Sequence, residues 1–322
     1  MNRELLKVNG LKVYYKGKRK NIFDEATLVK AVDGISFTVN SGESLGIVGE
    51  SGCGKTSAAL ALTGLAPITS GEILLDNRPI GEGSKSEISK KIQIIFQDSY
   101  LSLDPRYTVG KTIEEPLVIH KWASADKRKE RVLGLMEEVG LRKEYYNRLP
   151  HEFSGGQRQR VNIARALALN PSIIVCDEPV SALDVSIQAQ ILNLMKRLQK
   201  QYGLAYVFIS HNLSVVRFLC ERIAVMYLGH IVEIAGRDEF FNNTLHPYSK
   251  ILLNSVPSPN PKLKKTGEVL TVDTIDYLNP EKGCVFHTRC AFANEICKSA
   301  RPELKSYGTG HEAACHRIGE FG

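Results

Sequence analysis

Apolar and polar residues alternate along the first part of the chain, as they do in half-buried strands. The alternation covers residues 5–15 and 31–39. A short apolar run at 45–48 predicts a buried strand, residues 71–79 predict a strand that ends in an Asp-Asn turn, and residues 92–96 predict another. We therefore expect the N-terminal part of the chain to be rich in strands.

The spacing of apolar residues becomes helical between residues 108 and 170. Ser124 is placed to cap a helix that ends at Gly140. A second helix is expected to begin near Gly156 and to end before Pro171. This segment has the character of a helical insertion.

Strand and helix patterns alternate again after the insertion. Residues 173–176 are a continuous apolar run, which is typical of a strand buried on both faces. Residues 186–202 predict a helix that ends at Gly203, and residues 205–209 predict the next strand. Strands that alternate with helices favour an α/β fold with a largely parallel central sheet.

The stretch that follows the strand at 45–48 carries candidate chemistry. Residues 49–56 read Gly-Glu-Ser-Gly-Cys-Gly-Lys-Thr, and a helix-compatible run follows them. A strand, a glycine-rich turn and a helix in this order form a phosphate site, because backbone N–H groups and the helix N-terminus attract anions. We expect Lys55 to reach the β- and γ-phosphates and the Thr56 hydroxyl to ligate Mg²⁺. The motif predicts binding of a nucleoside triphosphate.

Two carboxylates, Asp177 and Glu178, directly follow the apolar run at 173–176. In a parallel sheet this is the carboxyl edge, where ligands bind. An acid there can hold Mg²⁺, and a neighbouring glutamate can accept a proton from an attacking water. A pair of exposed acids at the end of a strand is the alternative interpretation.

Two further motifs fit the same chemistry. Residues 154–157, Ser-Gly-Gly-Gln, open a predicted helix and offer a second anion site, although they could simply cap that helix. His211 follows the strand at 205–209 and is a candidate for contact with the γ-phosphate, although a lone histidine is more often structural.

Composition narrows the class of protein. The chain is 43% hydrophobic and 24% charged, as globular proteins are. It has no apolar run of the roughly 18 residues that a membrane span needs, and its N-terminus is too polar for a secretory signal. The net charge of +7 is modest, and we interpret the basic run at 16–20 as a solvated loop. No basic, aromatic-rich stretch predicts single-stranded nucleic acid as a partner. We expect a cytosolic protein.

Four of the seven cysteines crowd the C-terminal end. Cytosolic thiols stay reduced, so a cluster of this kind suggests a metal before a disulfide framework. Four thiolates suit an iron–sulfur cluster or Zn²⁺, and unmetallated thiols are the third interpretation. His287 and His316 are spare candidate ligands or surface histidines. The four cysteines are Cys284, Cys290, Cys297 and Cys315.

The order of the motifs resembles the nucleotide-binding subunit of an ABC transporter. It is the phosphate loop, Gln97, Ser-Gly-Gly-Gln, Asp-Glu, Ser-Ala-Leu-Asp at 181–184, and His211. The resemblance implies a P-loop NTPase fold of the ABC type over residues 1–255. Its parts would be a RecA-like core, an antiparallel β-subdomain and a helical subdomain at about 98–168. Beyond Pro257, Pro259 and Pro261, residues 256–322 would form a small cysteine-rich extension.

In this family two subunits enclose two ATP molecules head to tail. The resemblance implies that Thr56 and Gln97 ligate Mg²⁺ with support from Asp177, that Glu178 is the general base and that His211 contacts the γ-phosphate. It also implies that residues 154–157 close on the ATP of the opposite subunit, that Asp184 lies at the dimer seam, and that Tyr15, or its neighbour Tyr14, stacks on adenine. The expected nucleotide and Mg²⁺ contacts are Tyr15, Gly49, Glu50, Ser51, Gly52, Cys53, Gly54, Lys55, Thr56, Ser57, Gln97, Asp177, Ser154, Gly155, Gly156, Gln157 and Asp184.

Four stretches resemble the F-type ATPase subunit of oligopeptide and dipeptide importers: residues 29–37, 95–106, 227–234 and 245–257. The resemblance implies a D-type ATPase as heterodimer partner, two transmembrane permeases that contact residues 98–125, and an extracellular peptide-binding protein. The subunit would lie on the cytoplasmic face of the membrane.

Alternatives remain at this point. The isolated chain could form a homodimer, and the cargo could be nickel or another small solute. A soluble ABC ATPase that acts on nucleic acid or ribosomes is a further reading. Residues 283–290 resemble a C-terminal motif that holds a [4Fe–4S] cluster, which we expect in a structural role, with Zn²⁺ as the alternative.

Overall fold

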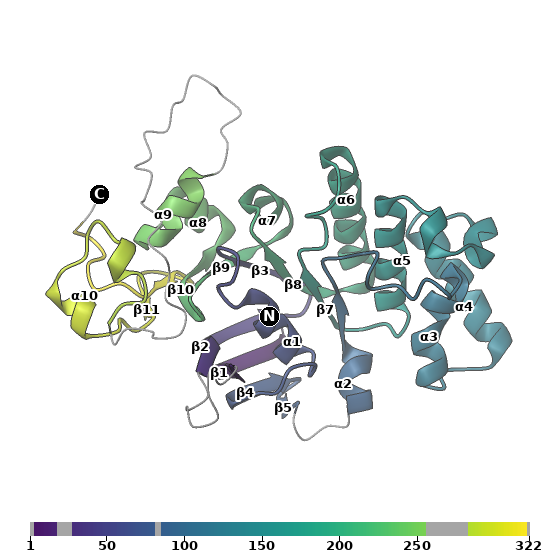
Figure 1. Cartoon of the computed structure of the whole chain (residues 1–322), viewed down its shortest axis with the longest axis horizontal. Coiled ribbons are helices and arrows are strands. Elements are labelled where there is room, and N and C mark those ends of the chain that lie inside the picture. Colours follow the sequence, from purple (N-terminus) through teal and green to yellow (C-terminus); the bar gives the residue numbers. More distant parts are fainter. Residues whose placement is uncertain (1–2, 18–27, 81–84, 256–282, 321–322) are drawn as a thin grey trace.

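Two β-sheets and a group of helices make up the computed structural model, which describes residues 3–17, 28–80, 85–255 and 283–320 (Figure 1). The strands of the described residues are β1 (Glu4–Lys16), β2 (Leu28–Asn40), β3 (Ser44–Val48), β4 (Ser70–Leu75), β5 (Arg78–Pro79), β6 (Ile92–Ile95), β7 (Ile173–Asp177), β8 (Ala205–Ser210), β9 (Arg222–Tyr227), β10 (His230–Gly236), β11 (Lys305–Ser306) and β12 (Glu312–Ala313). The α-helices are α1 (Lys55–Leu62), α2 (Lys85–Lys91), α3 (Val109–Ile119), α4 (Ala125–Glu138), α5 (Gly155–Leu167), α6 (Val185–Tyr202), α7 (Leu213–Leu219), α8 (Arg237–Asn242), α9 (Pro247–Asn254) and α10 (Glu295–Ser299). Three 3₁₀ turns lie at Lys143–Asn147, Pro150–Glu152 and His287–Arg289.

The smaller sheet is antiparallel and has the strand order β2-β1-β4-β5. Buried and less buried residues alternate along β1 and β2, as the sequence predicts for half-buried strands. Asp76 and Asn77 form the predicted turn after β4 and have positive φ values of 52° and 61°. This is the conformation that Asn and Asp tolerate best in a two-residue hairpin turn.

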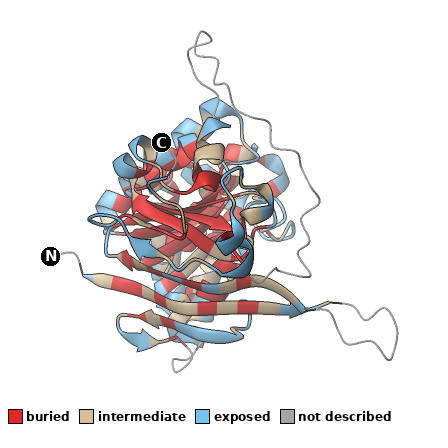
Figure 2. Ribbon diagram, turned by 90° about the vertical axis from the view of Figure 1, so that its left-hand side faces the viewer, coloured by how far each residue is buried: buried red, intermediate tan, exposed pale blue. Residues whose placement is uncertain are grey.

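The larger sheet has the order β11-β12-β10-β9-β3-β8-β7-β6, and β9 to β6 run parallel. Every residue of β3, β7 and β8 is buried, as Figure 2 shows for the centre of the molecule. Helix α1 contacts β7 and β8 on one side and β1 and β2 on the other, so it lies between the two sheets. The parallel strands therefore end at one edge that faces the start of α1.

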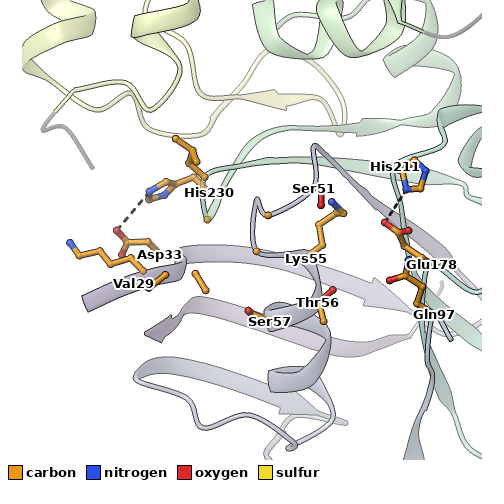
Figure 3. Close-up of a pocket in the computed structure, with 16 residues that line it drawn as sticks. Val29, Asp33, Ser51, Lys55, Thr56, Ser57, Gln97, Glu178, His211 and His230 are labelled. Atoms are coloured by element: carbon orange, nitrogen blue, oxygen red, sulfur yellow. Dashed lines mark hydrogen bonds and ion pairs between the residues drawn. The ribbon is translucent and has the colours of Figure 1, made fainter. Parts of the chain in front are cut away.

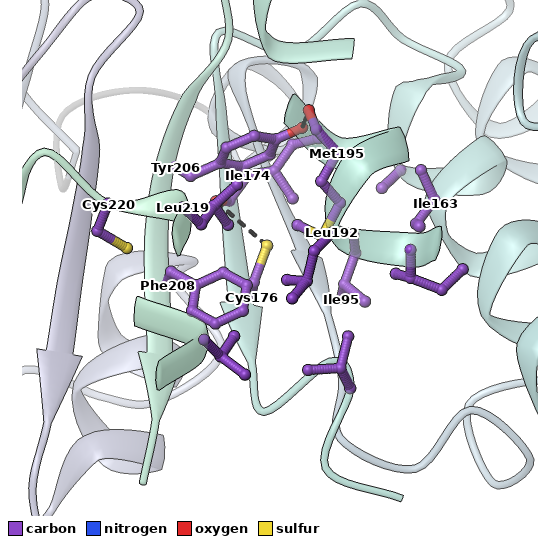
Figure 4. Close-up of a cluster of buried hydrophobic side chains, with 14 of the residues drawn as sticks. Ile95, Ile163, Ile174, Cys176, Leu192, Met195, Tyr206, Phe208, Leu219 and Cys220 are labelled. Carbon is purple, nitrogen blue, oxygen red and sulfur yellow. Dashed lines mark hydrogen bonds between the residues drawn. The ribbon is translucent and has the colours of Figure 1, made fainter. Parts of the chain in front are cut away.

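Two hydrophobic cores flank the large sheet, one on the face that α1 covers and one on the other face. Cys176 of β7 lies in the latter core among Ile95, Leu192 and Phe208, and the Tyr206 hydroxyl donates to the carbonyl oxygen of Met195 at 3.1 Å (Figure 4). Cys176 and Cys220 are fully buried and occupy apolar core positions. Burial raises the pKa of both thiols.

Helices α3, α4 and α5 pack against one another. They follow β6 and precede β7 in the chain, where the sequence predicts a helical insertion. The predicted helix after Ser124 is α4, and Gly140 follows it with φ 75°. The Thr108 hydroxyl accepts the N–H of Lys111 and caps α3. The bounds of the helical subdomain at about 98–168 stay a prediction.

The C-terminal segment, defined here as residues 283–320, packs against the large sheet. Strand β12 pairs with β10 through Ala313 and Glu233, so the segment adds two short strands to the sheet edge. The proline-marked boundary at 257–261 lies outside the described residues, and the division at 255/256 stays a prediction. Among the residues that the structure describes, no helix is both long and apolar enough to span a bilayer.

Candidate nucleotide site

A pocket of about 600 Å³ opens at the carboxyl edge of the parallel strands (Figure 3). Lys55 and Thr56 from the start of α1, Gln97 after β6, Glu178 after β7 and His211 after β8 all line it. These residues are far apart in the sequence, and the strand order brings them to one place, as the sequence predicts. Asp33 and His230 form the opposite wall.

The glycine-rich loop has a conformation that requires glycine at Gly54. This residue caps α1 with φ 106°, and a Cβ there would lie 1.9 Å from the carbonyl oxygen of Ala31. The side chain of Lys55 follows, and its Nζ donates to the carbonyl oxygens of Gly49 and Glu50 at 2.8 Å each. The lysine charge is thus held beside the loop amides, which is the arrangement that attracts phosphate.

Cys53 lies within this loop and is 3% exposed. Burial raises the pKa of its thiol, against the opposing effect of Lys55. The residue is therefore a small neutral side chain in the loop.

Asp177 is the last residue of β7 and is 5% exposed. Burial raises the pKa of its carboxyl, while a hydrogen bond with Thr56 lowers it. Its Oδ1 atom is buried and has no hydrogen-bond partner among the described residues. A buried carboxylate oxygen without a partner, on a residue that is hydrogen-bonded to a hydroxyl, is an oxygen-rich surrounding that fits Mg²⁺.

Glu178 and His211 lie together at the mouth of the pocket. The Nδ1 atom of His211 is 3.0 Å from Oε1 of Glu178, and the histidine side chain is 60% exposed. Glu178 has φ 49°, a left-handed conformation that costs free energy for a residue with a Cβ. Strained residues of this kind cluster at functional sites. The carboxylate can accept a proton from a water in the pocket, and the imidazole can donate to an anion beside it.

The Ser-Gly-Gly-Gln motif lies at the start of α5, away from this pocket. Ser154 Oγ accepts the N–H of Gln157, and the Ser154 N–H donates to Oε1 of Gln157 at 3.0 Å, so the two residues form a capping box. A Cβ on Gly156 would lie 2.5 Å from Cγ2 of Ile187, which shows how closely α5 approaches α6. The capping interpretation is thus satisfied within the chain, and the contact with a second ATP stays a prediction, as does the seam position of Asp184 at the N-terminus of α6.

The two tyrosines differ in their surroundings. The Tyr14 hydroxyl donates to Oδ1 of Asp33 at 2.5 Å, and burial raises its pKa to about 12. Tyr15 is 36% exposed and does not line the pocket, although Val29, its neighbour on β2, does. Stacking of Tyr15 on adenine stays a prediction.

Sequence reasoning missed Asp33 and His230 as pocket residues. Oδ2 of Asp33 is 3.7 Å from Nε2 of His230. A dashed line marks this pair in Figure 3. Burial, followed by the nearby charge of Arg301, lowers the pKa of His230 to about 4, so this imidazole is neutral at neutral pH. An aspartate on an alternating strand and a histidine after a Leu-Gly turn belong to no motif, so no sequence pattern marked either residue as part of the pocket.

The prediction of a [4Fe–4S] cluster, with Zn²⁺ as its alternative, is wrong. Nowhere in residues 3–17, 28–80, 85–255 and 283–320 do three or more His, Cys, Asp or Glu side chains form a group that could hold a metal ion. The four C-terminal cysteines do line one cavity, but its volume is only about 10 Å³ and Phe286 also lines it. Burial raises the pKa of the Cys284 thiol to about 11 and also raises the pKa values of Cys290 and Cys315, which favours neutral thiols over metal-binding thiolates.

Comparison with known proteins gives a family for the whole chain. Residues 32–181 match the model of the ABC transporter family, and residues 232–297 match the model named oligopeptide/dipeptide transporter, C-terminal region. The dipeptide transport ATP-binding protein DppF of Haemophilus influenzae is 47% identical over 98% of each chain. The oligopeptide transport ATP-binding protein AppF of Bacillus subtilis is 50% identical over 89% of each chain.

A solved structure agrees with this result. The ATP-binding cassette MJ0796, in a dimeric post-hydrolysis state bound to ADP and Pi, superimposes with a TM-score of 0.63 at 30% identity. The match covers 72% of this chain and 99% of that one. The fold, the pocket and the two family models point to the same conclusion. This chain belongs to the ABC transporter family, among the oligopeptide and dipeptide transport ATP-binding proteins.

Proposed function

We propose that the chain is the ATP-hydrolysing subunit of a membrane importer of oligopeptides or dipeptides. The observation that carries the proposal is the near full-length similarity to peptide transport ATP-binding proteins, which extends through residues 232–297, beyond the ATPase motifs. Nickel or another small solute remains the alternative cargo. A role on nucleic acid or ribosomes has no support in these relatives.

The pocket geometry supports a division of roles among its residues. Lys55 and the loop amides bind the phosphates, and Thr56, Gln97 and Asp177 hold Mg²⁺, which neutralises phosphate charge when it is bound. Glu178 accepts the proton of the attacking water. His211, which is 3.0 Å from Glu178, contacts the γ-phosphate. Catalysis of this type rests on positioning and electrostatics.

The separation of the Ser-Gly-Gly-Gln motif from the pocket supports a head-to-tail pair of ATPases. Residues 154–157 would close on the ATP of the second subunit, and Asp184 would lie at the seam. The related cassette MJ0796 is described as dimeric. We propose a D-type ATPase as the second subunit, with a homodimer of the isolated chain as the alternative.

A group of exposed apolar side chains supports the proposed contact with the permeases. Leu101 is 80% exposed and Ile119 is 68% exposed, and Tyr100 and Trp122 are about half exposed. All four lie within residues 98–125. Large apolar side chains left exposed in one segment are available for an interaction with a partner. Two transmembrane permeases, an extracellular peptide-binding protein and a position on the cytoplasmic face of the membrane complete the proposal.

Uptake of labelled di- and oligopeptides by cells that lack this subunit tests the function. We expect uptake to be lost, to return with the wild-type chain and to stay lost with Lys55→Ala at equal expression. Normal peptide uptake in the deletion strain, with loss of nickel uptake instead, would contradict the peptide assignment.

A further inference from the structure

An arginine of the C-terminal segment binds directly to the phosphate loop. Nη1 of Arg289 donates to Oε2 of Glu50 at 2.9 Å, and Nη2 donates to Oε1 at 3.0 Å. The two residues are 239 positions apart in the chain. Paired parallel hydrogen bonds between a guanidinium and a carboxylate fix both the distance and the orientation of the two groups. The contact is therefore a specific one between the C-terminal segment and the loop.

The protein holds Arg289 in position from its other sides. The guanidinium lies 5.7 Å from the ring centre of Tyr227 and 5.8 Å from that of Phe286. Nη1 also donates to the Tyr227 hydroxyl at 3.3 Å, and the arginine side chain is only 11% exposed. The hydrogen bonds to Glu50 raise the pKa of the guanidinium further above its usual value. Because Tyr227 and Phe286 already hold the arginine side chain in place, forming the ion pair with Glu50 costs less side-chain entropy than forming an exposed pair does.

Glu50 is held at its backbone as well as at its side chain. Its N–H donates to the Tyr248 hydroxyl at 2.9 Å. Its carbonyl oxygen accepts from Nζ of Lys55 at 2.8 Å, and the same Nζ binds the carbonyl oxygen of Gly49. Arg289, Tyr248 and Lys55 thus fix the first turn of the loop. Because all three bind Glu50, a change at Arg289 can alter the position of Lys55.

The charge of Glu50 gives the contact a consequence for the nucleotide. A carboxylate on a loop that binds a triphosphate repels the ligand, and solvent screens this repulsion only in part because Glu50 is partly buried. The guanidinium cancels this charge and keeps the carboxylate turned toward the C-terminal segment. Without it, the loop would carry an unpaired negative charge next to its anion site.

The same segment also reaches the opposite wall of the pocket. Nη1 of Arg301 is 3.6 Å from Oδ2 of Asp33 and 3.1 Å from Nε2 of His230. Figure 3 shows Asp33 and His230 across the pocket from Lys55. The segment thus contacts the phosphate loop through Arg289 and the Asp33–His230 wall of the pocket through Arg301.

We propose that Arg289 is a positioning residue of the nucleotide site, and that through its pair with Glu50 the C-terminal segment sets the affinity of the phosphate loop for MgATP. The proposal rests on the proposed function, because it requires that the pocket binds ATP. The expected effect is on the dissociation constant of the nucleotide, while the rate of hydrolysis in the saturated complex stays near that of the wild type.

A calorimetric titration of the full-length chain with Mg²⁺ and a non-hydrolysable ATP analogue tests the proposal. Arg289→Ala should raise the dissociation constant about tenfold, which corresponds to about 1.4 kcal/mol. Glu50→Gln is the second single variant of the double-mutant cycle, which measures the coupling between the two side chains. Combining Glu50→Gln with Arg289→Ala should restore most of the affinity, because the unpaired charge is then gone. Lys298→Ala is the matched control, since it removes an exposed ion pair with Glu295 in the same segment and should leave affinity unchanged.

The outcomes separate the two proposals. Failure of the wild-type chain to bind the analogue would contradict the proposed function. Normal wild-type binding with unchanged affinity in Arg289→Ala would overturn the positioning role. Equal weakness of Arg289→Ala and the double variant would overturn it too, because only the charge of Glu50 predicts recovery. Should Arg289→Ala fail to fold, Arg289→Gln with and without Glu50→Gln measures the same coupling.

Discussion

The phosphate pocket and the Ser-Gly-Gly-Gln segment are both anion sites by sequence, yet their surroundings differ. In the pocket, charged and polar groups from six parts of the chain meet around about 600 Å³ of open space. At the end of β7, Asp177 keeps a buried oxygen atom without a partner among the described residues. At the start of α5, Ser154 and Gln157 already satisfy each other. The pocket therefore offers open space and an unpartnered oxygen atom to a ligand in the single chain, whereas we propose that the Ser-Gly-Gly-Gln segment binds nucleotide only against a second subunit.

The largest expected effect comes from Glu178→Gln, which keeps the shape of the pocket and removes its proposed general base. Phosphate release by the assembled transporter should fall by roughly 10²–10⁴-fold, the usual contribution of general base catalysis. Binding of MgATP should persist, because no phosphate contact is lost. Steady-state phosphate release and nucleotide titration on one preparation check both halves. Phosphate release near the wild-type rate would show that Glu178 is not the general base.

Most of the fold could be predicted from the sequence because its elements obey strong local rules. The apolar run at 173–176 became β7, and Gly140 and Gly203 end their helices with positive φ, as glycine allows. The motif residues of the pocket were predicted because their spacing along parallel strands fixes their common edge. Helix α3 was only implied by the helical period of its region.

What the sequence could not supply depends on packing between distant residues. Nothing local marks Arg289 as a partner of Glu50, because the contact joins a loop and a 3₁₀ turn at opposite ends of the chain. The four C-terminal cysteines show the converse. Their crowding was visible, but only the fold shows that they meet around a small apolar cavity, with burial favouring the neutral thiols of Cys284, Cys290 and Cys315.

The next effect tests the pocket side of the comparison through its backbone. Gly54→Ala places a Cβ 1.9 Å from the carbonyl oxygen of Ala31, at φ 106°. The loop must shift, so affinity for MgATP should fall by more than about tenfold, or 1.4 kcal/mol. Titration of the isolated chain measures the change, with Gly134→Ala as control, because a Cβ at Gly134 meets no atom within 4 Å. Unchanged affinity would show that the loop tolerates a different conformation.

A smaller effect tests the other side. Gly156→Ala brings a Cβ 2.5 Å from Cγ2 of Ile187, and overpacking of this kind costs about 1–3 kcal/mol of stability. Thermal unfolding should show the loss, and Ile187→Ala in the same chain should relieve much of it. Nucleotide affinity of the isolated chain should stay unchanged, in contrast to Gly54→Ala. A weaker nucleotide affinity of the Gly156→Ala chain would show that the Ser-Gly-Gly-Gln segment and the pocket act on the same nucleotide within one chain.

Acidification separates effects on the fold from effects on either site. Burial lowers the pKa of His246 from 6.5 to about 3, so the unfolded chain binds this proton first as the pH falls. The stability from the neutral imidazole is present above pH 6.5 and is lost as the pH falls toward about 3, with a slope of at most about 1.4 kcal/mol per pH unit. His246→Asn keeps an acceptor for the N–H of Tyr248 and should flatten the slope of the urea midpoint against pH. An equal slope in both chains would assign the effect to other groups, of which His230 is the first.

The central claim, that the pocket and the Ser-Gly-Gly-Gln segment serve different nucleotides, is tested most directly by Ser154→Asp. Aspartate keeps the N-terminal cap of α5 and places a negative charge where the second subunit's ATP would close. We predict an unchanged dissociation constant for MgATP in the isolated chain and a loss of phosphate release in the assembled transporter. Weaker binding of MgATP by the isolated Ser154→Asp chain, or normal release by the transporter that contains it, would contradict the account.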